Sequence, residues 1–154
     1  MIEIIKEKTL AVTGHRNLKS DLDIEKLENE FLSQIKKGIN TFLVGMAIGF
    51  DAICFQILEK IRLNENIKII ACIPCEDQSK KFSYQQKLEY DRQVNSADDK
   101  IILSKEYTPY CMMKRNMFMV DNSSVLVCYL RENKGGTFNT VKYAKTQGLQ
   151  IIKI

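Results

Sequence analysis

Residues 42 to 58 read FLVGMAIGFDAICFQIL, and they pass from an apolar run directly into a helical pattern. The run that ends at Gly45 is continuous rather than alternating, as in strands that are covered on both faces. Apolar residues then recur at helical spacing over 51–63, which predicts an amphipathic helix. Between strand and helix stand Gly45 and Gly49, two of only seven glycines in the chain. A strand followed at once by a helix is the repeating unit of a parallel α/β sheet.

The same order of strand and helix continues from end to end. Apolar runs rich in β-branched residues predict strands over 8–14, 41–45, 68–74, 99–104, 124–130 and 150–154. Helices are expected between Ser20 and Gly38, with Ser20 and Asp23 as a capping pair, and over 51–63, 84–95, 111–121 and 137–147. Right-handed crossovers would then build a three-layer Rossmann-like α/β fold, with a mostly parallel sheet of about six strands and helices on both faces. Nothing divides the chain, so we expect one domain over 1–154, with 75–83 as a candidate mobile loop.

Composition narrows the class of protein. Of the 154 residues, 45% are apolar and 27% are charged, and the formal net charge is +4, which is ordinary for a folded domain and excludes a disordered chain. Basic residues form no block longer than a pair, and no apolar stretch approaches the roughly 18 residues of a membrane span. We therefore expect a cytoplasmic protein without a membrane partner, and a nucleic-acid partner is not favoured.

The five cysteines do not predict a disulfide or metal framework. Their number is odd and they lie mostly inside apolar runs, so reduced thiols are expected. Cys72 and Cys75 have the spacing of a dithiol, but Cys72 lies within a predicted strand rather than at a helix start. Zinc would need two further ligands at a matched spacing. We therefore expect neither a redox dithiol nor a metal site.

The glycines point to one edge of the sheet. Gly14, Gly45, Gly49, Gly135 and Gly136 all follow a predicted strand and precede a predicted helix. Such turns lie at the carboxyl edge, where open α/β sheets bind ligands in the crevice at the point where the strand order switches. A tight turn requires glycine on its own account. Five glycines at one edge nevertheless favour a ligand that approaches the backbone.

Two of these turns carry groups that suit an anion. The turn TGHR over 13–16 supplies His15 and Arg16, and a guanidinium makes paired hydrogen bonds to phosphate or carboxylate. The turn KGGTFNT over 134–140 opens the last helix with two glycines and Thr137, whose amides and hydroxyl would form a phosphate cradle. Neither the G-x-G-x-x-G nor the P-loop spacing is present, so ATP hydrolysis by the P-loop route is not supported.

Asp51 begins the second helix, and two interpretations stay open. Its carboxylate could cap the free amides at the helix start, where the positive end of the helix dipole favours it. Alternatively, it meets a ribose hydroxyl or a sugar carbon of a ligand, since a carboxylate in that place would compete with a phosphate.

The segment CMMKRNMFMVD over 111–121 has a stripe of methionines. Such a stripe is most often core. The predicted apolar face comprises Met112, Met113, Met117, Met119 and Val120, with Asn116 in its middle and Arg115 off it. A buried amide needs hydrogen-bond partners, so Asn116 either braces a neighbouring loop or reaches the crevice together with Arg115. A homo-oligomer formed through this helix is left open.

The motifs VTGHR, GMAIGFD, IPCEDQ, YTPYCMMKRNMFMVDNS and GGTFNTVKYAK, in this order, resemble the YpsA/YspA-like branch of the SLOG superfamily. That Rossmann-like group also contains the LOG proteins and the DNA-processing protein DprA. The resemblance covers nearly the whole chain, and it implies a crevice that binds a nucleotide or a nucleotide-derived ligand. By position, the ligand-facing residues would be Gly14, His15, Arg16, Gly45, Ala47, Gly49, Asp51, Arg115, Asn116, Gly135, Gly136 and Thr137.

One motif departs from the LOG enzymes. Those enzymes carry P-G-G-x-G-T-x-x-E, whose glutamate serves catalysis. Here the corresponding residues, 134–140, read KGGTFNT, without the proline, the further glycine or the glutamate. The departure speaks against phosphoribohydrolase activity of the LOG kind.

Three functions are compatible with these residues. The first is a binding module that senses or sequesters a nucleotide-like molecule, which needs only the backbone cradle and Arg16. The second is an enzyme that cleaves an N-glycosidic or phosphate bond, with Asp51 and His15 as catalytic candidates and Asp121 and Glu76 as less central ones. The third, ranked last because lysines are scattered and tryptophan is absent, is a DprA-like binder of single-stranded nucleic acid. The sequence leaves open the ligand and whether any reaction is catalysed.

Overall fold

Strands and helices alternate along the chain, as the hydrophobic pattern predicts. The computed structural model describes residues 2–154; Met1, the first residue of the predicted domain, lies outside them. The strands are β1 (Thr9–Gly14), β2 (Thr41–Val44), β3 (Lys68–Ile73), β4 (Asp99–Ile102), β5 (Val125–Tyr129) and β6 (Gln150–Lys153). The α-helices are α1 (Ile24–Lys36), α2 (Phe50–Arg62), α3 (Tyr84–Ser96), α4 (Cys111–Asp121) and α5 (Gly136–Thr146), and a short 3₁₀ turn, η1, spans Lys6–Lys8. None of the helices within 2–154 is long and apolar enough to cross a membrane.

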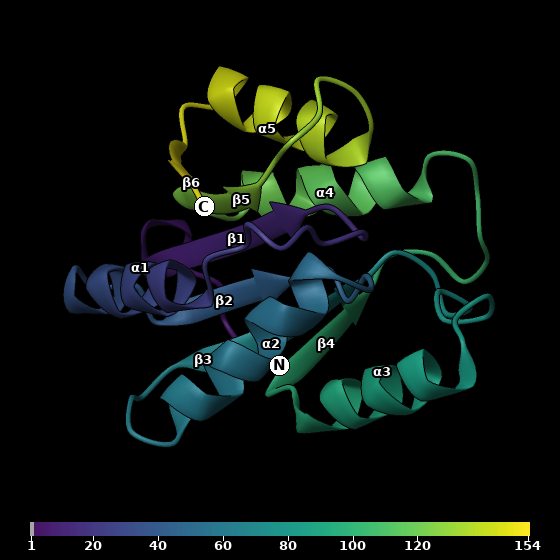
Figure 1. Cartoon of the computed structure of the whole chain (residues 1–154), viewed down its shortest axis with the longest axis horizontal. Coiled ribbons are helices and arrows are strands. Elements are labelled where there is room, and N and C mark those ends of the chain that lie inside the picture. The colour runs from purple at the N-terminus through teal and green to yellow at the C-terminus, as the bar shows by residue number, and fades with distance from the viewer. Residues whose placement is uncertain (1) are drawn as a thin grey trace.

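All six strands are parallel and follow the order β4-β3-β2-β1-β5-β6 (Figure 1). The predicted Rossmann-like α/β fold is therefore confirmed. From β1 the chain builds outward through β2, β3 and β4, and then returns to place β5 and β6 on the other side of β1. The strand order thus switches direction beside β1. Open α/β sheets bind ligands at the carboxyl ends of the strands at such a point.

Successive residues of the strands enter two separate apolar cores. In β1, Leu10 and Val12 pack on one face and Ala11 on the other. The first face is covered by α1, α2 and part of α3, the second by α4 and α5, as Figure 1 shows. This alternation explains why the inner strands β1, β2, β3 and β5 are mostly apolar: their side chains are buried on both faces of the sheet.

The start of α1 corrects one local prediction. Asp23 is its N-cap, and the carboxylate accepts a hydrogen bond of 3.0 Å from the amide of Lys26. Ser20 lies exposed, three residues earlier, and takes no part in the cap. The predicted capping pair is therefore wrong in its first member, because the chain turns between 20 and 22 before the helix begins.

Candidate functional site

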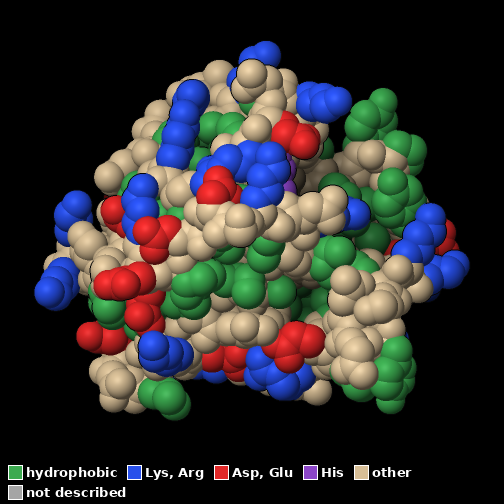
Figure 2. Space-filling model, viewed as in Figure 1, with side chains coloured by type: hydrophobic (Ala, Val, Ile, Leu, Met, Phe, Trp, Pro, Cys, Tyr) green, Lys and Arg blue, Asp and Glu red, His purple; other side chains and the backbone are tan. Residues whose placement is uncertain are grey.

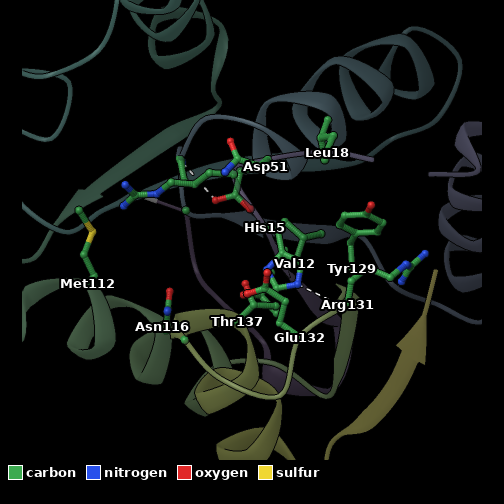
Figure 3. Close-up of a pocket in the computed structure, with 18 of the residues that line it drawn as sticks. Val12, His15, Leu18, Asp51, Met112, Asn116, Tyr129, Arg131, Glu132 and Thr137 are labelled. Carbon is green, nitrogen blue, oxygen red and sulfur yellow. Dashed lines mark hydrogen bonds between the residues drawn. The ribbon is translucent and has the colours of Figure 1, made fainter. Parts of the chain in front are cut away.

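A hollow of about 450 Å³ lies at the carboxyl ends of β1, β2 and β5, where the strand order switches. Its walls come from the loops after these strands, from α4 and from the start of α5. In Figure 3, Met112 and Asn116 lie on one side of it and Tyr129 and Arg131 on the other. The predicted ligand-facing residues that line it are Gly14, His15, Arg16, Gly45, Ala47, Asp51, Arg115, Asn116, Gly135, Gly136 and Thr137. Gly49, the remaining one of that set, does not.

Three of the five edge glycines serve the packing of the chain itself. A β-carbon on Gly14 would lie 2.4 Å from the ring of Phe50, and one on Gly49 would lie 2.2 Å from the carbonyl oxygen of Arg16. Gly49 also has φ of +81°, which side chains of L-residues rarely adopt. At Gly45 a β-carbon would meet the guanidinium of Arg115 at 2.7 Å. The close approach of the protein's own atoms is thus enough to require glycine at these three positions, and their contact with a ligand stays a prediction.

Gly135 and Gly136 differ from the others because they face open space. No atom lies within 4 Å of a β-carbon built on either residue. Gly135 is the N-cap of α5, with φ of +95°, and no side chain caps this helix. The amides of the first turn have no intrahelical partner, and they carry the positive end of the helix dipole. This turn, together with the buried Thr137, keeps the character of an anion cradle.

Asp51, at the start of α2, lines the hollow and does not cap its own helix. α2 begins at Phe50, and the Asp51 carboxylate turns back to accept a hydrogen bond of 3.1 Å from the amide of Ala47. The capping interpretation is therefore wrong. Only 6% of the residue is exposed, and this burial raises the pKa of Asp51 to about 6, although Arg115, the Ala47 amide and Arg16 each pull it down. Asp51 therefore changes protonation near neutral pH.

Arg115 corrects the prediction for α4. It was expected off the apolar face, but it is 5% exposed, whereas Met117, expected on that face, is 37% exposed. The Arg115 guanidinium donates hydrogen bonds to two main-chain carbonyls. One is that of Gly45, directly after β2, and the other is that of Cys72, near the end of β3, at 3.2 Å. Asn116 accepts from its Nε at 2.8 Å. Asn116 thus holds Arg115 in place and also lines the hollow.

His15 braces the loop after β5. Its Nε2 accepts a hydrogen bond of 2.8 Å from the amide of Arg131, so the neutral ring carries its hydrogen on Nδ1. The ring also packs edge-on against Tyr129, with centroids 5.8 Å apart. Arg131 is itself engaged, because it pairs with Asp21 at 2.7 Å and lies 4.3 Å above the Tyr129 ring. These contacts fix the mouth of the hollow.

Arg16 is exposed at the rim and, within residues 2–154, its side chain makes no hydrogen bond or ion pair. The exposed Lys19 and Lys134 line the same hollow. In the space-filling view, the histidine, drawn purple, is visible next to basic side chains, and an acidic side chain lies close to it as well (Figure 2). Basic side chains that form no ion pair within residues 2–154 thus line the same hollow as the free amides of α5.

Sequence reasoning missed the loop that joins β5 to α5. Tyr129, Arg131, Glu132 and Lys134 all line the hollow. Figure 3 labels Glu132 together with Thr137 and His15, which line the same hollow. Arg131, Glu132 and Lys134 lie between the predicted strand over 124–130 and the glycine pair, so the rule that placed the glycines at this edge also applied to them, whereas Tyr129 falls within that strand. The two less central catalytic candidates do not line the hollow: Asp121 accepts a hydrogen bond from Tyr143 instead, and Glu76 lies elsewhere.

A six-stranded parallel sheet with helices on both faces and a hollow at its switch point defines the chain as a Rossmann-like α/β protein. The sequence profile of the YspA SLOG family matches residues 6–151, and the chain belongs to that family. It is 33% identical to the uncharacterised SPbeta prophage-derived protein YoqJ of Bacillus subtilis, over 78% of this chain and 81% of that protein.

Solved structures of DNA processing protein A share the fold. The Streptococcus pneumoniae protein superposes with a TM-score of 0.68 at 14% identity, over 97% of this chain and 50% of that one. The Helicobacter pylori protein, solved for its single-stranded DNA binding mode, gives 0.67 at 16% identity, over 96% and 65%. The chain thus spans half to two thirds of those proteins, and at such identities the likeness shows the fold alone.

Proposed function

We propose that this protein binds a phosphate-bearing nucleotide in the hollow at the switch point and acts as a sensor or binding module. The observation that carries the proposal is that Arg16, whose side chain has no partner in residues 2–154, lines the same hollow as the uncapped start of α5 at Gly135 and Gly136. A phosphate there would accept from bare amides and from a guanidinium, the two donors that bind anions most effectively in proteins.

The rest of the hollow suits the sugar of such a ligand. Asp51, on α2, and Glu132, in the loop between β5 and α5, both line the hollow. Carboxylates accept hydrogen bonds from ribose hydroxyls, which is the role of the acidic residue in dinucleotide-binding folds. The volume of about 450 Å³ is in the range of small-molecule sites, about 300–1,000 Å³.

Thermal unfolding with a panel of ligands tests the proposal. The panel comprises mononucleotides, NAD, ADP-ribose and cyclic nucleotides. A ligand at 100 times its Kd stabilises the folded state by about 2.7 kcal/mol, which raises the Tm of a chain of this size by about 5–10 °C. We expect at least one nucleotide to raise Tm in a concentration-dependent manner.

Two variants locate the binding. Arg16→Ala should abolish the shift without lowering the Tm of the free protein, because the side chain is exposed and unpaired. Lys142→Ala is the matched control, since Lys142 is an exposed cation on α5 that does not line the hollow. The proposal fails if no nucleotide shifts Tm, or if both variants reduce the shift equally.

A hydrolase of nucleotide N-glycosidic bonds is the second candidate, and Asp51 is the observation that favours it. The carboxyl lines the hollow, and burial raises its pKa to about 6, where a group can serve as acid or base near neutral pH. His15 is less suited, because its Nε2 is occupied by the amide of Arg131. Nucleoside monophosphates incubated with the protein should then release free base, and Asp51→Asn should release none. This candidate is discarded if the wild type releases no more than a blank.

A further inference from the structure

A second hollow, of about 500 Å³, adjoins the first. The two share Arg16, Ala47 and Met112 in their walls, so Arg16 stands at their boundary. The remaining walls come mostly from the segment between β3 and α3, and Ile48, Gln86 and Tyr107 complete them. The hollow at the switch point can hold a mononucleotide on its own, so the second hollow offers room for a further part of a ligand.

The segment that walls the second hollow is held in place by hydrogen bonds. It belongs to 75–83, the candidate mobile loop. The side chain of Gln78 is buried: its Nε2 donates to the Gly45 carbonyl at 3.0 Å, and its Oε1 accepts from the Tyr90 hydroxyl at 3.1 Å. At the other end, Ser83 and Gln86 form a capping box at the start of α3. The Gly45 carbonyl also accepts from Arg115, so one atom ties the walls of both hollows together.

The chemistry of the second hollow differs from that of the first. Phe82 presents a ring that is fixed edge-on against Tyr90, with centroids 5.5 Å apart, and Tyr107 is 61% exposed. Ile48 and Met112 add apolar surface. Rings of this kind stack on planar groups such as nucleobases. Aromatic rings do not bind phosphate, so the rings of Phe82 and Tyr107 indicate a ligand with a planar group.

Cations stand where the two hollows meet solvent. Lys80 and Lys81 line the second hollow beside Arg16, and Asp77 is the one acidic side chain in its walls. A ligand that spans both hollows would pass Arg16 at its middle. A ligand with negative charge in its middle and a planar base at each end would place the charge at Arg16, between the hollows, and one base in each hollow.

We propose that the two hollows together bind a dinucleotide, that is, two nucleosides joined through phosphates. One nucleotide lies at the switch point, the bridging phosphates contact Arg16, and the second base lies against Phe82 and Tyr107. The proposal rests on the proposed function and adds the class of ligand.

Isothermal titration calorimetry with four probes tests it: AMP, ATP, NAD and P1,P2-di(adenosine-5′) diphosphate. We expect at least one of the two dinucleotides to bind at least tenfold more tightly than AMP. Phe82→Ala and, separately, Tyr107→Ala should each remove most of that gain and leave the affinity for AMP unchanged. Tyr84→Ala is the matched control, because Tyr84 is 75% exposed at the start of α3 and lines neither hollow. Tyr107 is exposed, so its variant keeps the test valid if Phe82→Ala unfolds.

The outcomes separate the two proposals. If AMP binds and neither dinucleotide binds more tightly, the dinucleotide inference is overturned and the proposed function stands. If ATP gains as much as the dinucleotides and the aromatic variants change nothing, the second hollow serves phosphate, and the inference is likewise overturned. If no probe binds, both proposals fall.

Discussion

Replacing Asp51 with asparagine should make the free protein more stable at pH 8. Burial of the carboxyl raises its pKa from the ordinary 3.8 to about 6. At about 1.36 kcal/mol for each pKa unit, the difference corresponds to about 3 kcal/mol of folding free energy. Asparagine has nearly the same shape, carries no charge at any pH, and can still accept the hydrogen bond from the Ala47 amide.

The pH dependence gives the sign of the effect. Because the pKa of Asp51 is higher in the folded state, the folded protein binds more protons than the unfolded chain between pH about 4 and 6. The stability that the protonated carboxyl contributes is complete below pH about 4 and is lost as the pH rises through about 6. The Asp51→Asn variant has no such loss, so its advantage over the wild type should grow from near zero at pH 4 to its full value by pH 7.

Thermal and urea unfolding of both proteins from pH 4 to 8, without ligand, measures this difference. A gain of about 3 kcal/mol corresponds to a Tm rise of about 6–12 °C for a chain of this size. Asp21→Asn is the control with the opposite sign: Arg131 and Tyr129 hold the pKa of Asp21 below its usual value, so this variant should be less stable at neutral pH. If Asp51→Asn is less stable than the wild type at pH 8, then Arg115 compensates the buried charge fully and the reasoning is refuted.

The remaining predictions concern two glycines, a serine and the rim arginine. Gly45→Ala should destabilise the protein by about 1–3 kcal/mol in urea, because the new β-carbon would lie 2.7 Å from the Arg115 guanidinium; equal stability would show that the pocket floor yields freely. Gly136→Ala meets no atom within 4 Å, so it should leave Tm unchanged or slightly higher while weakening nucleotide binding in calorimetry; unchanged binding would place the phosphate elsewhere. Ser123→Ala should stabilise by about 1 kcal/mol in urea, because the Ser123 Oγ is buried without a partner in residues 2–154; a loss of stability would reveal a partner for the hydroxyl. Nucleotide affinity should fall as salt rises, and less steeply in Arg16→Ala; identical slopes would remove Arg16 from the site.

The fold was predictable because the inner strands of the sheet are covered on both faces. A continuous apolar run such as that over 69–73 differs clearly from the helical spacing of Leu27 and Phe31, and the alternation of the two patterns leaves few topologies for a parallel sheet. The start of α1 was predicted incorrectly because two neighbouring residues compete for the same capping position. Asp23 and Ser20 are both good capping residues, and only the path of the chain before α1 determines which of them reaches a free amide.

The gathering of the site was predictable, but the role of each residue was not. The rule that strand ends share one edge brought the glycine turns, Arg16 and Asp51 together. It could not show that Arg115 is buried, because its acceptors are backbone carbonyls at Gly45 and Cys72, 70 and 43 residues away in sequence. Carbonyls at the end of a strand have no signature in side-chain hydropathy. The sequence likewise could not show that the Arg16 carbonyl packs against Gly49, a contact that by itself requires glycine at this position.

Arg16 and Arg115 differ in how their guanidinium groups are bonded, and this difference indicates where an anion would bind. Arg115 is committed inward, to two carbonyls and to Asn116, in a place where Asp51 already supplies negative charge. A phosphate brought there would lie close to the Asp51 carboxylate and would repel it. The Arg16 side chain, by contrast, is exposed and makes no hydrogen bond or ion pair within residues 2–154. The Arg16 main chain packs against Gly49, so the backbone is held in place while the guanidinium is available for a ligand. Under the proposed function, we therefore expect the phosphate between Arg16 and the start of α5, and the rest of the ligand next to the buried Asp51 and Arg115.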